Sequence, residues 1–91
     1  KKARELGIPE SKWIFMHGGG CLNDIWNVTD RLNLHSSPAI KKCSQAIFNA
    51  ANCSQADISS FDLYSCFPSA VQIARKEIGI PDGDNRDLTI T

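Results

Sequence analysis

The sequence has no excess of charge of either sign and no long apolar run, and each shortage excludes a class of protein. Ten lysines and arginines balance ten aspartates and glutamates, and no basic run is longer than two residues. A surface for nucleic acid or anionic lipid is therefore not expected. No apolar stretch approaches the ~18 residues needed to cross a bilayer. We expect neither a nucleic-acid partner nor insertion into a membrane.

Cysteine is also scarce for a disulfide-stapled scaffold. The chain has four cysteines in 91 residues, about half or less of the ~8–10% that is typical of such scaffolds. Cys43, Cys53 and Cys66 fall in or beside expected regular elements, where a small apolar residue serves equally well. We therefore expect a reducing compartment, the cytoplasm by default and a peroxisome or mitochondrion as the alternative in a eukaryote.

The two ends of the chain read as parts of elements. Residues 1–7 have the pattern of the last turns of a helix closed by Gly7, and residues 88–91 alternate as a half-buried strand does, with no turn after them. We expect a fragment of a larger protein, the alternative being a small domain with frayed ends. A chain of this size buries only ~64% of its unfolded surface, so its core is thin.

Two amphipathic helices are expected. A capping serine and a proline at the first helical position introduce residues 37–51, and the helix 68–78 begins with Pro68 and ends at Gly79. Each has an apolar stripe at helical spacing, which predicts one buried face. The stripe of the first contains Ala39, Ile40, Cys43, Ala46, Ile47 and Ala50, and that of the second Ala70, Val71, Ala74 and Ile78.

Three strands are expected around these helices. Residues 12–17 form an aromatic and β-branched run, residues 58–66 alternate in polarity, and residues 88–91 complete the set. The predicted order is β-α-β-α-β, which favours an α/β fold with helices packed on a mostly parallel sheet.

The junction between the second strand and the second helix, at residues 64–68, is the most suggestive place for chemistry. Ligands of open α/β sheets bind where a strand ends and a helix begins, and the free amides there favour anionic groups. Cys66 could be a thiolate with His17 or His35 as its base, or a small residue packed under the strand end. Ser65 lacks the flanking glycines of a nucleophile elbow.

Three other features of the sequence give weaker evidence of a functional site. Residues 18–20 are three glycines that match no phosphate-binding fingerprint, so a flexible turn is favoured. His17, Cys21 and His35 do not have zinc-site spacing, and no metal is expected. Trp13 and Trp26 are expected to be core or interface anchors.

The stretch 57–67 resembles the thiolase superfamily, whose signature after a strand reads Asn-Glu-Ala-Phe or His-Asp-Cys-Phe. Here it reads Tyr64-Ser65-Cys66-Phe67. The runs His-Ser-Ser-Pro-Ala-Ile from His35 and Asp-Leu-Tyr-Ser-Cys-Phe-Pro-Ser-Ala-Val-Gln from Asp62 look closest to sterol-carrier-protein-type thiolases. The resemblance divides the chain into the end of a thiolase amino-terminal half (1–20), a connecting loop (21–36) and the start of the carboxy-terminal half (37–91).

The resemblance implies acyl-CoA chemistry, either thiolysis of a 3-oxoacyl-CoA or the reverse Claisen condensation, with CoA esters as substrates and no further cofactor. The acylated cysteine and the His and Cys bases of such enzymes have no matching positions here, so the fragment itself is expected to be inactive. The oxyanion-hole position falls on Tyr64, and Cys66, Phe67 and His35 are expected substrate contacts.

Two alternatives remain open beside this reading. One is a non-catalytic thiolase-like protein that binds acyl-CoA, and the other is a structural or dimerisation segment. A homo-oligomer is expected in either case.

Overall fold

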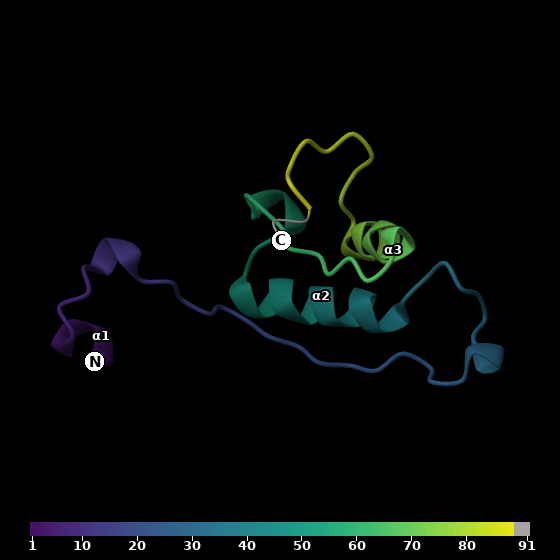
Figure 1. The fold of residues 1–91 in the computed structure, drawn as a ribbon, viewed down its shortest axis with the longest axis horizontal. Helices are drawn as coiled ribbons and strands as arrows, with labels where there is room; N and C mark the ends of the chain where they lie inside the picture. The colour runs from purple at the N-terminus through teal and green to yellow at the C-terminus, as the bar shows by residue number, and fades with distance from the viewer. Residues whose placement is uncertain (89–91) are drawn as a thin grey trace.

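The computed structural model describes residues 1–88 of the chain, and its ordered centre is a pair of helices (Figure 1). The short helix α1 (Lys2–Glu5) stands apart from α2 (Pro38–Ala51) and α3 (Pro68–Ile78). Three 3₁₀ turns accompany them: η1 (Glu10–Lys12), η2 (Val28–Asp30) and η3 (Gln55–Asp57). The two long helices pack against each other, and α3 is seen nearly end-on where α2 lies across the view.

Helix α2 confirms the expected helix 37–51 and its start. Ser37 is the N-cap, its hydroxyl oxygen accepts a hydrogen bond from the Ile40 amide at 3.2 Å, and Pro38 occupies the first turn. The apolar stripe is partly covered: Ala39 is buried, while Ile40, Cys43 and Ile47 are half-buried. Ala46 and Ala50 remain exposed.

Helix α3 spans the residues expected for it. Pro68 lies in its first turn, and Gly79 ends it with a φ of 85°, a left-handed conformation that a glycine adopts without strain. All four residues of its predicted stripe are half-buried. Arg75 and Lys76 occupy the last turn, where positive charge complements the helix dipole.

The expected β-α-β-α-β order and its parallel sheet are wrong, because no strand forms among residues 1–88. Residues 14–17 make no backbone hydrogen bond to another described residue, and Ile14 and Met16 are 96% and 91% exposed. Two amides of the second expected strand donate hydrogen bonds, Phe61 N to Asp87 O at 3.3 Å and Leu63 N to Leu88 O at 2.8 Å, which is too little for a ladder. Of the third expected strand, residues 89–91 lie outside the described part.

The three glycines at 18–20 are not a flexible turn. The segment is extended and lies along α2, in the direction opposite to the helix (Figure 1). A methyl group added at Gly18 would stand 3.1 Å from the Ile47 carbonyl oxygen, and one at Gly20 would stand 3.5 Å from the Cys43 sulfur. Gly19 faces open space, as the alternation of an extended chain requires. Glycine therefore allows close approach of this backbone to the helix.

The core is thinner than the length alone predicts. Ala39 and Ile80 are its buried apolar residues among those described. The accessible surface is 7417 Å², whereas a compact monomer of this mass has ~5,200 Å². The radius of gyration is 16.2 Å, against ~12 Å for a compact domain of this length. No helix in the described part is long and apolar enough to cross a membrane.

Candidate functional site

The segment 58–67 leads to the start of α3 and presents the residues that the sequence singles out. The two hydrogen bonds from Phe61 N and Leu63 N tie it to the chain that follows α3. The donor that lies later in the chain, Leu63, bonds to the acceptor that also lies later, Leu88. The two segments therefore run in the same direction, as two parallel strands would. This contact fixes the backbone directly before Tyr64.

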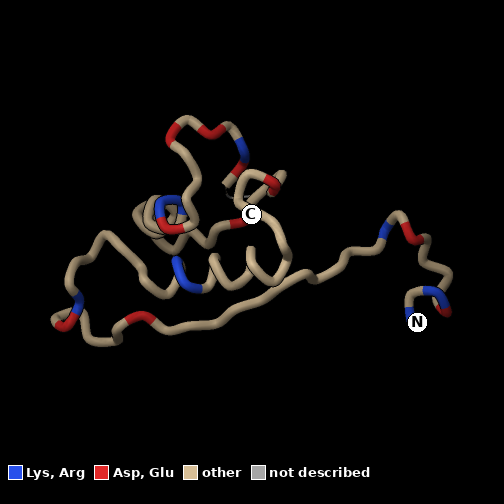
Figure 2. Tube along the Cα trace, turned by 180° about the vertical axis from the view of Figure 1, so that it is seen from behind, with Lys and Arg blue, Asp and Glu red and all other residues tan. Residues whose placement is uncertain are grey.

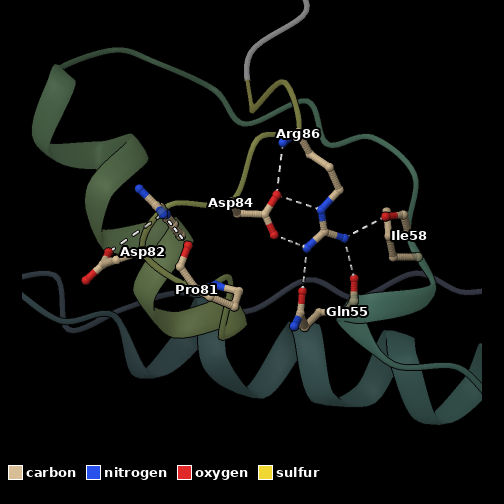
Figure 3. A network of polar contacts seen from close by, with 7 residues as sticks. Gln55, Ile58, Pro81, Asp82, Asp84 and Arg86 are labelled. Atoms are coloured by element: carbon tan, nitrogen blue, oxygen red, sulfur yellow. Dashed lines mark hydrogen bonds and ion pairs between the residues drawn. The ribbon is translucent and has the colours of Figure 1, made fainter.

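Arg86 fastens the base of this segment (Figure 3). Its Nη1 donates to the carbonyl oxygens of Gln55 and Ile58 at 2.7 and 2.6 Å. Its Nη2 donates to Gln55 Oε1 at 2.8 Å, and its Nε to Asp84 Oδ1 at 2.9 Å. The guanidinium also stacks on Phe61, 5.0 Å from the ring centre. One side chain thus joins the turn after α3 to η3 and to the segment that carries Tyr64.

Asp84 completes this network as a charged partner. Its Oδ1 also accepts the Arg86 amide at 2.9 Å, the pattern of an Asx turn. The hydrogen bonds from the Arg86 side chain and amide, together with its positive charge, lower the pKa of Asp84 to about 2. The same pairing raises the pKa of Arg86. Both groups are therefore charged across the physiological range.

The predicted site residues at the junction all face outward. Tyr64 is 84% exposed, Phe67 is 69% exposed, and the Cys66 thiol is free and exposed. Phe67 is the N-cap of α3 and supplies no side-chain cap. Pro68 has no amide hydrogen, and the Ser69 amide makes no hydrogen bond to the described residues. The start of α3 therefore offers a free donor beside these side chains.

His35 lies at a different place. It lines an open cleft of about 780 Å³ between the loop before α2 and one face of α3. The cleft does not include Tyr64, Cys66 or Phe67. The other residues that line it are Leu34, Ser69, Gln72, Ile73, Arg75, Lys76, Gly79, Ile80, Pro81 and Asp82. Ser69 belongs to the first turn of α3, so the cleft that His35 lines extends to this helix.

A second polar cluster joins the loop to both long helices. The carboxylate of Asp24 accepts the Ser37 hydroxyl at 2.6 Å and the Ala39 amide at 3.1 Å. The Ser37 amide donates to Glu77 Oε1 of α3 at 3.2 Å. Ser37 is itself only 4% exposed. The hydrogen bond from Ser37, reinforced by the Ala39 amide and the charge of Arg31, lowers the pKa of Asp24.

The other residues singled out in the sequence are the candidate metal ligands and the two tryptophans. In the described part of the chain, no three His, Cys, Asp or Glu side chains are grouped as a metal site would need. Trp13 is half-buried against α1, with its indole N–H donating to Ile8 O at 3.0 Å and Arg4 over its ring at 5.3 Å. Trp26 is 83% exposed, so it does not anchor the core of this chain.

Sequence reasoning missed Arg86, Asp84 and the role of Asp24. Asp84 stands two residues before Arg86 in the turn after α3, which is a local signal for an Asx turn that fixes the arginine. Asp24 gave no local signal, because its partners lie 13 and 15 residues further along the chain.

The fold of the described residues is thiolase-like. The chain is similar to a monomeric SCP2-thiolase-like protein type 1 from Mycobacterium smegmatis, with 33% identity and a TM-score of 0.85. The match covers 99% of this chain and 20% of that one, so the chain spans about one fifth of that protein's length. No family model and no curated protein sequence matches the chain.

Proposed function

We propose that this chain is part of a thiolase-type acyltransferase that acts on acyl-CoA. The reaction is thiolysis of a 3-oxoacyl-CoA by CoA, or the reverse Claisen condensation of two acyl-CoA molecules. The likeness to an SCP2-thiolase-like protein over 99% of the chain supports the class. The signature Tyr64-Ser65-Cys66-Phe67, placed at the start of α3, supports the chemistry.

The observation that carries the proposal is the geometry of that junction. Tyr64 stands exposed at the end of an extended segment, and Arg86 holds the base of the segment through two backbone carbonyls. In our account the Tyr64 hydroxyl donates a hydrogen bond to the thioester oxygen as negative charge develops on it. The positive end of α3 favours the same charge. Cys66 and Phe67 contact the acyl group, and His35 contacts the substrate from the cleft side.

The chain does not carry the whole reaction in this proposal. The cysteine that is acylated and the His and Cys bases belong to parts of the thiolase-like fold that these 91 residues do not match. The test is acyl transfer from acetyl-CoA, measured for the longer protein that contains this chain and for the 91 residues alone. We expect turnover by the former and none by the latter. Thiolysis by the 91 residues alone would overturn the assignment and make Cys66 the nucleophile.

One observation favours a second candidate, a thiolase-like protein that binds CoA esters without turnover. The signature has Tyr64 where thiolases have Asn or His, and a phenol is longer than an amide, so it would displace a water molecule bound beside the smaller group. This candidate predicts that the longer protein binds acetyl-CoA but forms no acyl-enzyme. Mass spectrometry of the protein after incubation with acetyl-CoA separates the two, because only the first candidate adds an acetyl group.

A further inference from the structure

The guanidinium of Arg86 has every hydrogen-bond donor engaged within the chain. A guanidinium carries one N–H on Nε and two on each terminal nitrogen. Nη1 donates to the carbonyl oxygens of Gln55 and Ile58, Nη2 to Gln55 Oε1 and Asp84 Oδ2, and Nε to Asp84 Oδ1 (Figure 3). No donor is left over for a substrate, so this side chain holds other parts of the chain.

The positive charge of Arg86 is balanced inside the chain as well. Arg86 is the one basic residue after Lys76 in the sequence, and acidic residues stand on either side of it at Asp84 and Asp87. Figure 2 shows this as a blue segment with red on both sides in the turn that follows α3. A charge that is already paired attracts an anionic ligand weakly, which again favours a structural partner for this arginine.

The contacts of Arg86 lie on the segment that leads to Tyr64. The carbonyl oxygens of Gln55 and Ile58 are 2.7 and 2.6 Å from Nη1. The same guanidinium lies over the ring of Phe61, 5.0 Å from its centre. One rigid group therefore fixes both the path of this segment and its rotation about its own axis.

The rotation of the segment decides where Tyr64 points. The two residues that follow the arginine accept backbone hydrogen bonds from Phe61 N and Leu63 N, at 3.3 and 2.8 Å. Phe61 and Leu63 are half-buried on this side. Tyr64 lies on the opposite face of the extended segment and is exposed. Holding the first face in place therefore aims the phenol outward from the second.

We propose that Arg86 is a positioning residue for Tyr64. Its fork and its ring contact set the backbone before Tyr64 and thereby the place of the phenol hydroxyl. The effect on catalysis rests on the proposed function, in which that hydroxyl meets the thioester oxygen, whereas the structural link does not. A lysine in place of Arg86 keeps the charge but cannot form the fork. A displacement of about 1 Å in a reacting group can cost on the order of 10²-fold in rate.

Hydrogen exchange in the longer protein that contains this chain tests the structural link. In Arg86→Lys we expect the amides of residues 61–64 to exchange about tenfold faster or more, because the bonds from Phe61 N and Leu63 N open more often. The amides of α2 should exchange as in the parent. Unchanged exchange at residues 61–64 overturns the proposal, and so does faster exchange that extends through α2, because the effect is then on the whole fold.

Arg4→Lys is the matched control for this substitution. Arg4 also pairs with a carboxylate, that of Glu10 at 2.9 Å, and also lies over an aromatic ring, that of Trp13 at 5.3 Å. It makes these contacts near the start of the chain, with no contact to the segment before Tyr64. Exchange at residues 61–64 should be the same in Arg4→Lys as in the parent.

A double-mutant cycle on acyl transfer from acetyl-CoA tests the catalytic consequence in the same longer protein. We expect Arg86→Lys to lower kcat by about 10–100-fold with KM little changed. In a Tyr64→Phe background the same substitution should change kcat by less than about twofold, because there is no hydroxyl left to position. An equal loss of kcat in both backgrounds overturns the proposal, since Arg86 then acts through another group.

The two measurements separate this proposal from the proposed function. A longer protein that shows no acyl transfer contradicts the proposed function, and the exchange of residues 61–64 in Arg86→Lys then decides alone whether Arg86 positions Tyr64. A parent with turnover and an Arg86→Lys variant with unchanged kcat overturns the positioning role while the proposed function stands.

Discussion

Ser37 shows how one buried residue can hold three segments together. Its hydroxyl caps α2 and donates to Asp24 of the extended loop, and only 4% of the residue is exposed. Its amide reaches Glu77 of α3. A serine before Pro38 was expected as a helix cap from the sequence, but the two long-range partners were not, since nothing local marks them.

Ser37→Ala should destabilise the chain by about 1–3 kcal/mol, because the cap is lost and the Asp24 carboxylate loses its shortest partner. Ser44→Ala is the control, since the Ser44 hydroxyl bonds to Lys41 O on the exposed face of α2. Urea unfolding followed by circular dichroism measures both. Equal midpoints for the two variants would contradict the role given to Ser37.

The Asp84–Arg86 pair makes the stability of the folded chain depend on pH in the acid range. The pKa of Asp84 is about 2 in the folded chain and near 3.8 when the group is unpaired. The stabilisation is therefore fully present above about pH 4 and is lost as the pH falls through 2. Asp24, whose pKa is also lowered, acts in the same direction.

Arg86→Lys should raise the pKa of Asp84 from about 2 toward 3.8, since an ammonium group lacks the forked geometry that reaches Asp84, Gln55 and Ile58 at once. Carboxyl chemical shifts of Asp84 in a pH titration report this directly. Lys76→Arg, on the exposed face of α3, serves as a control that should leave the titration unchanged. An unchanged Asp84 titration in Arg86→Lys would show that the fork does not set this pKa.

At the scale of elements, the helices could be predicted from the sequence and the strands could not. Helices α2 and α3 are encoded locally: their caps, prolines and apolar stripes lie within the segments themselves. A strand exists only with a partner: the run at 13–17 has none among the described residues, and that at 58–66 makes only two backbone hydrogen bonds to the chain after α3. The strand predicted at residues 12–17 is therefore wrong, because Lys12 ends the turn η1 and the residues after it are extended and mostly exposed.

The close contact between residues 18–20 and α2 predicts how the chain responds to a larger side chain at Gly18 and at Gly19. Gly18→Ala should destabilise the chain by about 1–3 kcal/mol, because the added methyl group would stand 3.1 Å from the Ile47 carbonyl oxygen, and a carbonyl held in a helix yields less readily than the end of a side chain. Gly19→Ala should have little effect, since nothing lies within 4 Å and its φ is not positive. Thermal unfolding of the two variants is the measurement. The reverse order of stabilities would mean that this segment does not lie on α2 in solution.

At the scale of the whole molecule, the extended shape is the main departure from what the sequence predicted. A length of 91 residues predicts that ~64% of the unfolded surface is buried. The accessible surface of 7417 Å² is still about half of the unfolded area, so only about half is buried. The long axis of 53 Å reflects an arm that packs on α2 at the glycines and extends beyond it. The chain is similar to about one fifth of a longer thiolase-like protein. The exposed apolar surface is consistent with that likeness, because in such a protein other parts of the fold would cover it.

The candidate site, like the fold, could be predicted from the sequence only where the signal is local. The resemblance puts Tyr64 and Phe67 at a junction before a helix; Phe67 is the N-cap of α3 and Tyr64 lies three residues before it, and the roles expected for them stay predictions. It did not locate Arg86, which fixes the segment before them through hydrogen bonds that span 28 and 31 residues. Contacts at that range follow from the three-dimensional path of the chain, and a single sequence does not reveal them.

In the function proposed above, Tyr64 supplies the hydrogen bond that stabilises the thioester oxyanion. The most direct measurement is the rate of acyl transfer from acetyl-CoA by the longer protein, compared between the parent and Tyr64→Phe. We expect a loss of about 10²–10³ in kcat with KM little changed in Tyr64→Phe, because the donor acts on charge that develops in the transition state. An unchanged kcat in a folded Tyr64→Phe variant would contradict it.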